Sequence, residues 1–440
     1  MDRGLAVLCF LMGMAMMLVA FPEGFTAAAI VLLSSLVVVF IIRRQFKEDA
    51  DFLIQLFLIA LLARLTFGLV VHFFDLRGFF GGDSKTYDLV GQRLVEMWYG
   101  YNFVTNDDIS QKIYASDSGW GMYYLVGAIY SIFGRNILAA QSFCAVIGAA
   151  TVPMVYTCAH KIFNNMRVGK ISALLVALYP AFIIWSGQLL KDGLVIFLLV
   201  LVMTLVLRLQ EKFRFFDIVL LGFSLFGIIS LRFYIFYMVA LAIVGAFVIG
   251  TSNSGQAVGR RIAALVLMGF GLTYFGVTRN SGSEVEEYAN LERIQRSRAD
   301  LATRAESGYG GDLDVSTTEG AFAALPVGLT YLLLAPFPWQ MTNWRQAITL
   351  PEVLLWWASI PFLLSGLWYT IRNRLRSSIP ILVFSLMLTL AYSIFLGNIG
   401  TAYRQRTQIQ VFLFMFIAVG WTLRQERSEN KNLLRKVKRK

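Results

Sequence analysis

Apolar runs long enough to cross a lipid bilayer recur along this chain and restrict its fold more than any other feature. An α-helix crosses the hydrocarbon core in about 20 residues. Of the 440 residues, 57% are hydrophobic and 15% are charged, which excludes an ordinary water-soluble protein. We therefore predict an all-α polytopic membrane protein with about 12 transmembrane helices. The predicted spans are 5–20, 25–42, 52–74, 137–159, 170–187, 192–209, 216–231, 233–250, 262–278, 352–371, 379–397 and 407–423.

Two shorter, aromatic-rich apolar segments, 120–134 and 322–337, are predicted to be partial or surface helices. The prediction follows from the basic clusters at 43–47, 161–170 and 372–376, because short basic loops stay on the cytoplasmic side of a membrane. All these clusters lie on one side only if neither short segment crosses. Both termini are then cytoplasmic, and the protein is predicted to be a multi-pass protein of the cell inner (plasma) membrane.

This topology predicts one transmembrane domain over 1–440 with three polar parts. They are a first outer loop at 75–120 with an amphipathic helix, a second long outer loop at 279–351, and a basic cytoplasmic tail at 424–440. The formal net charge of +12 gathers in the loops and tail predicted to face the cytoplasm, so it does not indicate a nucleic-acid partner. The expected partners are membrane lipids and a lipid-borne substrate.

A polar, glycine-led stretch follows the third predicted span at residues 81–88, with sequence GGDSKTYD. Apolar residues then recur at helical spacing from Tyr87 to Tyr101, which predicts an amphipathic helix along the membrane surface. At its start, Asp83 could act as a general base or hold a divalent cation. Alternatively, Asp83 or Ser84 only caps the helix. No motif identifies a cofactor, which stays unknown, with a divalent cation considered.

Two groups of charged residues lie at the predicted outer surface. The pair Lys191 and Asp192 sits between two apolar spans, where charges are costly and therefore often functional. The alternative is a turn whose lysine extends to the interface. Arg404 and Arg406, supplemented by Arg232, oppose the positive-inside trend, and guanidinium groups suit phosphate oxygens. They could instead anchor the chain to anionic headgroups.

The order of these features resembles a known family. An outer-loop aspartate is followed by a tyrosine (GDSKTY, 82–87), a partial helix ends in FGRN (133–136), and a span leads through Tyr179 and Pro180 into a polar outer turn. This arrangement is similar to the integral-membrane glycosyltransferases of the GT-C type, which use polyprenyl-phosphate-linked sugars and are related to the protein O-mannosyltransferase group. The resemblance covers about residues 50–210. The segment GTAYRQR (400–406) also looks like the closing motif of cell-surface polysaccharide enzymes.

The resemblance implies a function and roles for named residues. Asp83 would be the catalytic base and Asp192 a second catalytic acid. The donor's phosphate would meet Arg404 or Arg406, and the other substrate-binding residues would be Tyr87, Lys191 and Arg232. A sugar would pass with inversion from a polyprenyl-phosphate donor to a cell-envelope glycan or lipid acceptor on the outer face. Ser84 stands where the family often has a second acid, which argues against a metal-bound mechanism.

Two other functions remain open. A polysaccharide repeat-unit polymerase or ligase would use the same lipid-linked sugars and outer arginines, and could work without an essential Asp83. A lipid-linked oligosaccharide flippase or transporter would carry charges in the middle of spans and an internal repeat. Arg64 is the main charge of this kind, and no repeat is evident, which makes the transporter the weaker alternative.

Overall fold

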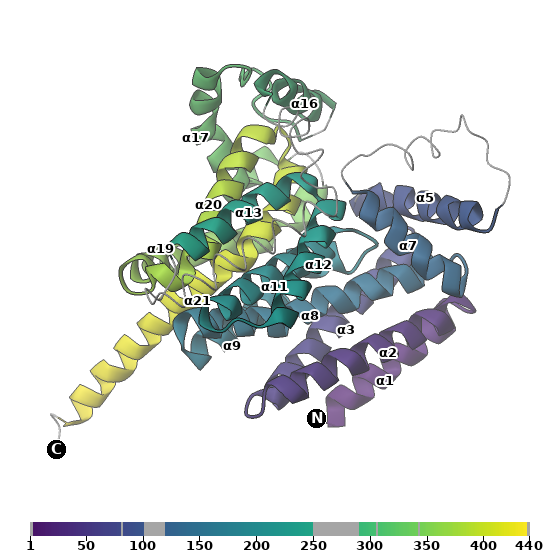
Figure 1. Cartoon of the computed structure of the whole chain (residues 1–440), viewed down its shortest axis with the longest axis horizontal. Coiled ribbons are helices and arrows are strands. Elements are labelled where there is room, and N and C mark those ends of the chain that lie inside the picture. The colour runs from purple at the N-terminus through teal and green to yellow at the C-terminus, as the bar shows by residue number, and fades with distance from the viewer. Residues whose placement is uncertain are drawn as a thin grey trace. The chain divides into compact units, whose positions relative to one another are not determined.

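The computed structural model describes residues 3–80, 82–100, 119–249, 290–304, 307–341 and 344–437. Over these ranges the chain folds into helices, and extended pairing is limited to a single bridge between Gly308 and Asn398 (Figure 1). The predicted all-α class is confirmed. The span predicted at 262–278 lies outside the described residues.

The described chain forms two compact units. Unit 1 comprises residues 1–155, 173–201 and 224–236, and unit 2 comprises 156–172, 202–223 and 237–440. The helices are α1 (Arg3–Val19), α2 (Glu23–Gln45), α3 (Ala50–Phe73), α4 (Arg77–Phe80), α5 (Asp83–Trp98), α7 (Trp120–Phe133), α8 (Ile137–Phe163), α9 (Met166–Leu178), α10 (Pro180–Ser186), α11 (Asp192–Glu211), α12 (Phe215–Leu231), α13 (Phe233–Ile249), α16 (Leu291–Arg304), α17 (Thr318–Leu334), the 3₁₀ turn η1 (Pro338–Gln340), α18 (Trp344–Ile348), α19 (Leu350–Asn373), α20 (Leu375–Phe395) and α21 (Ile399–Val437).

Seven of the described helices are long and apolar enough to cross a membrane: α2, α3, α8, α11, α19, α20 and α21. The pair α9 and α10 would make an eighth span if it is counted as one bent helix. Shorter apolar helices are α1, α7, α12, α13 and α17. These helices indicate a multi-pass membrane protein, and the total of about 12 crossings stays a prediction.

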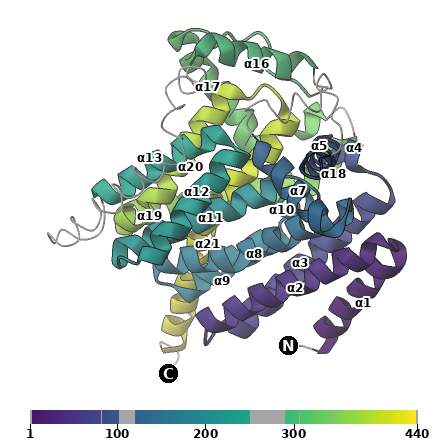
Figure 2. The same ribbon diagram turned by 45° about the vertical axis from the view of Figure 1, so that its right-hand side comes forward.

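Small residues let the helices of each unit approach closely. In unit 1, α1, α2 and α3 lie side by side in both ribbon views (Figures 1 and 2), and Gly24 at the start of α2 touches the Met16 carbonyl of α1. Gly91 of α5 faces Val126 of α7, where an added Cβ would lie 2.5 Å from the Val126 side chain. In unit 2, Gly366 of α19 packs on the backbone of α21. Such contacts are typical of helix pairs in membranes.

The structure differs from the sequence prediction at two helix boundaries. The predicted span 170–187 is two helices, α9 and α10, which meet at 56° because Pro180 cannot continue the hydrogen-bond ladder. The stretch between the predicted spans 379–397 and 407–423 is mostly helical, because Asn398 Oδ1 accepts from the Thr401 amide (3.0 Å) and caps the start of α21. Arg404 and Arg406 therefore lie on the first turns of a helix.

Proline leaves a helix carbonyl without its usual donor at the end of α9. The Val176 carbonyl would accept from the residue four positions on, which is Pro180 and has no N–H. Arg64 of α3 replaces that donor: its Nη2 lies 3.3 Å from the Val176 oxygen, and its Nη1 lies 3.3 Å from the Ala177 oxygen. The buried guanidinium thus completes the C-terminus of α9, where a positive charge is also favoured.

An arginine side chain also hydrogen-bonds the carbonyls at the C-terminus of α17 in unit 2. The carbonyls of Leu332 and Leu334 lose their donors to Pro336 and Pro338. The Nη1 of Arg406 donates to the carbonyls of Leu332 (3.5 Å), Leu333 (3.1 Å) and Ala335 (2.8 Å), and the Trp357 indole donates to Leu334 (3.0 Å). The end of α17 is therefore saturated by side chains from α19 and α21.

A third arginine, Arg298 of α16, donates to the Ile394 carbonyl at 2.8 Å near the end of α20. Among the described residues, Arg64, Arg298 and Arg406 are the three largest fully buried side chains. Each donates to backbone carbonyls at or near a helix C-terminus. Carbonyls that are buried in a nonpolar environment must be hydrogen-bonded, and these arginines supply the donors.

We predict that Arg406→Met lowers the free energy of unfolding by at least about 2 kcal/mol, because carbonyls at the end of α17 lose their donor. Thermal unfolding of the purified protein in detergent measures the change. The control is Arg427→Met, which removes an exposed arginine from the same helix. Equal melting temperatures for the two variants would contradict the capping role.

Candidate functional site

A buried ion pair lies where α11 begins in unit 1. Asp192, the first residue of α11, is completely buried, and its Oδ1 accepts from Arg232 Nη2 at 2.7 Å. Arg232 sits between α12 and α13, and its Nη1 also donates to the Tyr234 hydroxyl at 2.7 Å. The two residues are 40 positions apart in sequence and were predicted separately, so their pairing is a result of the fold.

The start of α7 packs against this ion pair's neighbours. Gly119, the N-cap of α7, has a φ of 109°, and a Cβ added there would lie 2.6 Å from Lys191 Nζ. A Cβ on Gly121 would lie 2.7 Å from the Ser230 Cβ. Only glycine allows this close approach with this backbone conformation. We call Gly119, Lys191, Asp192, Ser230 and Arg232 the helix-end cluster.

The electrostatics of the helix-end cluster favour an anion. Three helices, α7, α11 and α13, begin at or directly beside its members, and helix N-termini carry partial positive charge. Lys191 and Arg232 add two positive charges and Asp192 contributes one negative charge. Lys191 is half-buried, whereas Asp192 and Arg232 are buried. The lysine is therefore the charged member most accessible to a ligand, and phosphate groups suit such a position.

The segment that leads into Lys191 is fixed by buried contacts with α3. Ser186, at the end of α10, accepts from Arg64 Nε at 2.8 Å. Gly187 lies against α3, where a Cβ on Gly68 would come within 2.6 Å of the Gly187 carbonyl oxygen. The arginine that completes α9 thus also fixes the segment leading to Lys191 and Asp192.

Asp83 is the first residue of α5, and its side chain is exposed. Gly82 occupies the N-cap position, one residue before Asp83. Asp83 and Tyr87 are four residues apart on α5 and share a helix face. Tyr87 is buried, with its ring 5.8 Å from that of Tyr123, which lies one turn into α7 from Gly119.

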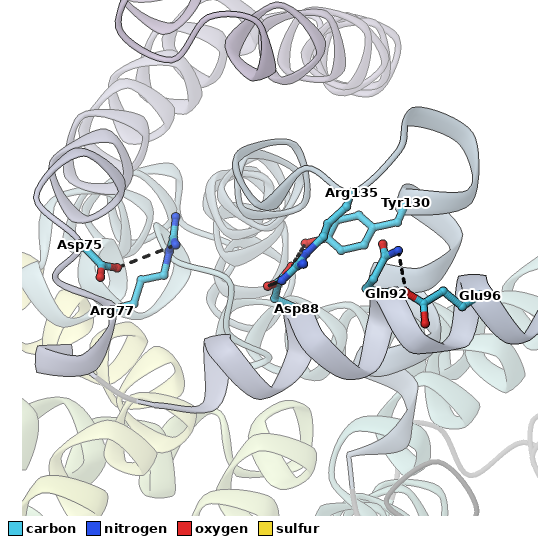
Figure 3. Close-up of polar contacts among 7 residues, drawn as sticks. All are labelled: Asp75, Arg77, Asp88, Gln92, Glu96, Tyr130 and Arg135. Carbon is cyan, nitrogen blue, oxygen red and sulfur yellow. Dashed lines mark hydrogen bonds and ion pairs between the residues drawn. The ribbon is translucent and has the colours of Figure 1, made fainter. Parts of the chain in front are cut away.

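Asp88 anchors α5 to the end of α7, a role that the sequence analysis missed. It accepts from the Tyr130 hydroxyl at 2.8 Å and from Arg135 Nε at 3.1 Å, and a second bond reaches Arg135 Nη2 at 2.5 Å (Figure 3). These hydrogen bonds raise the pKa of the Arg135 guanidinium above its ordinary value. The available signal was the FGRN segment, which supplies Arg135. Asp88 holds α5 against α7 and so helps to fix the position of Asp83 at the start of α5.

Arg404 and Arg406 belong to unit 2. Arg404 is half-buried on α21, and Arg406 is fully buried in the contacts with the end of α17. Beside them, the Tyr403 hydroxyl donates to Glu352 Oε2 at 2.6 Å. The structure therefore brings Lys191, Asp192 and Arg232 together within unit 1, whereas the two arginines have their own surroundings in unit 2. In the described parts of the chain, no three His, Cys, Asp or Glu side chains are grouped to hold a metal ion.

Residues 117–277 match the family model described as dolichyl-phosphate-mannose-protein mannosyltransferase. The match confirms the resemblance to GT-C type integral-membrane glycosyltransferases. It includes all five residues of the helix-end cluster, whereas Asp83, Tyr87, Arg404 and Arg406 lie outside it. No curated protein matches the chain. The matched family indicates a membrane glycosyltransferase of the mannosyltransferase type.

We predict that Gly119→Ala displaces the Lys191 ammonium group, because the new methyl group would lie 2.6 Å from Nζ. Amine-reactive labelling followed by peptide mass spectrometry should show a several-fold change in Lys191 modification. Gly100→Ala is the matched control, since Gly100 also has a positive φ (77°) but open space around it. Unchanged Lys191 labelling in Gly119→Ala would disprove the contact.

Proposed function

We propose that the protein transfers a sugar from a polyprenyl-phosphate donor to a cell-envelope glycan or lipid acceptor on the outer face of the plasma membrane. The observation that carries this proposal is the helix-end cluster, a positively charged group of helix ends inside the region that matches the mannosyltransferase family. A lipid-linked sugar presents a phosphate at the membrane surface, which such a cluster suits.

In this proposal Lys191 binds the donor phosphate directly, and the buried Arg232 contributes positive charge to the same site. Asp192 is buried and accepts from Arg232, so we assign it the role of holding the guanidinium in place. A buried carboxylate in this contact is poorly placed to meet an acceptor hydroxyl. We prefer this cluster to Arg406 as the phosphate site, because Arg406 is fully buried and its Nη1 donates to carbonyls at the end of α17.

Asp83 is proposed as the general base. Its carboxylate is exposed at the start of α5, and the packing of Tyr87 on Tyr123 connects that helix to the turn of α7 that touches Lys191. In the reaction, the acceptor oxygen bonds to the anomeric carbon while the bond from that carbon to the phosphate oxygen breaks. The acceptor proton passes to Asp83, and polyprenyl phosphate leaves with its negative charge near Lys191. The sugar is transferred with inversion.

We expect Lys191→Met to raise the KM for polyprenyl-phosphate mannose about tenfold or more, because a charge-assisted hydrogen bond contributes about 1.5–3 kcal/mol. Proteoliposomes with this donor and an extract of envelope lipids as the acceptor pool would measure KM and kcat separately. Lys191→Arg should restore most of the affinity. Lys212→Met, at an exposed lysine, is the control. A KM equal to the unmodified protein's would contradict phosphate binding by Lys191.

In the same assay, Asp83→Asn is expected to lower kcat by about 100-fold or more with little change in KM, as loss of a general base does. Asp51→Asn is the matched control, since Asp51 is also an exposed aspartate in the first turn of a helix. Full activity of Asp83→Asn would favour the polymerase or ligase alternative, which can work without this base. The family resemblance would survive that result, but the assigned base would not.

A further inference from the structure

Unit 1 contains an apolar cavity of about 380 Å³ among α1, α2 and α3. It lies away from the helix-end cluster in sequence and uses none of its residues. The walls are mostly hydrocarbon and sulfur, and four methionines of α1 contribute to them: Met12, Met14, Met16 and Met17. Methionine side chains are flexible and adapt to an irregular apolar ligand. No charged residue lines the cavity.

The sequence explains why the helices leave this space. At one end, the contact of Gly24 with the Met16 carbonyl pins α1 to α2. Further along α1, a Cβ added to Gly13 would meet no atom within 4 Å, so this position opens onto the cavity that it lines. Ala28 and Ser35 line the facing side from α2. Helices α1 and α2 are therefore close together near the turn that joins them. Further from that turn, the small residues Gly13, Ala28 and Ser35 leave a space between the helices.

Water is a poor occupant of this cavity. A buried water needs two to four polar partners, and Ser35 is the one residue of the cavity lining whose side chain carries a hydroxyl. An apolar occupant is thus favoured over water.

The cavity's length distinguishes between hydrocarbon ligands. Its walls run from Cys9 to Met17 on α1 and from Ala28 to Ser35 on α2, which is about 10–12 Å at 1.5 Å per residue. One leaflet of the hydrocarbon core is about 15 Å thick, half of the full core. The cavity therefore fits most of one acyl chain, and a long polyprenyl chain would extend far beyond it. The exposed side chains of Phe10 and Leu32 at its rim allow entry from the bilayer.

We infer that this cavity is a binding site for one acyl chain of a bilayer phospholipid, held between α1 and the α2–α3 pair. The acyl chain would fill the space that the protein side chains leave open, and it would contact both α1 and the α2–α3 pair. This role is independent of the proposed transferase activity, since no residue of the helix-end cluster takes part.

The test uses vesicles of phosphatidylethanolamine and phosphatidylglycerol that contain phosphatidylglycerol with a diazirine in the middle of one acyl chain. After irradiation, peptide mass spectrometry should place the cross-links on cavity residues between Cys9 and Met17. Gly13→Leu places a side chain in the cavity from a position where a Cβ meets no atom within 4 Å, and it should reduce these cross-links at least several-fold. Gly4→Leu is the matched control on α1, because Gly4 also has open space around it but does not line the cavity.

Two results would overturn the inference. One is labelling spread equally over outward-facing residues such as Leu18 and Leu33, with no loss in Gly13→Leu, which indicates ordinary contact with surrounding lipid. The other is stronger labelling of the cavity by a diazirine-bearing polyprenyl phosphate than by the phospholipid probe. If Gly13→Leu does not fold, Ser35→Leu fills the same space from α2, and the cross-link map of the unmodified protein still decides between these outcomes.

Discussion

The hydrogen-bonding requirement of backbone carbonyls at interrupted helix ends governs much of this structure. Pro180, Pro336 and Pro338 each remove an N–H that a carbonyl four residues earlier would use. In a nonpolar environment such a carbonyl cannot be left to water, so a side chain must replace the donor. Arg64 does so for α9, and Arg406 does so for α17 together with two tryptophans. A guanidinium suits this position because it has several donors and a positive charge, which the C-terminus of a helix attracts.

The break at Pro180 also shapes the candidate site. Because α9 ends there, the chain turns through α10 and reaches Lys191 and Asp192 as the start of a new helix. Arg64 stabilises both sides of the break, through the carbonyls of α9 and the hydroxyl of Ser186. The charged residues therefore stand on a rigid support, although they occupy a turn. Arg232 then pairs with Asp192 from another part of unit 1, and Gly119 at the start of α7 lies close to Lys191.

Local sequence patterns were sufficient for some elements and insufficient for others. The spacing from Tyr87 onward predicted α5, and the apolar runs predicted most long helices, because both signals depend on neighbouring residues only. Arg404 and Arg406 were predicted in a loop, since their polarity suggested an end to the span, but the Asn398 cap starts a helix there. The clamp from Asp88 to Arg135 was missed because its partners are 47 residues apart and each resembles a surface charge in sequence.

The sequence alone determined that the chain is helical and membrane-embedded, since hydrophobicity and its period are properties of single segments. It also identified Lys191, Asp192 and Arg232 as charges in costly positions, and it carried the resemblance that the match over 117–277 supports. Only the tertiary structure decided that Asp192 and Arg232 are partners, that Arg406 faces carbonyls, and that a cavity opens beside Gly13. Each of these depends on distances between segments far apart in the chain, which are set by packing.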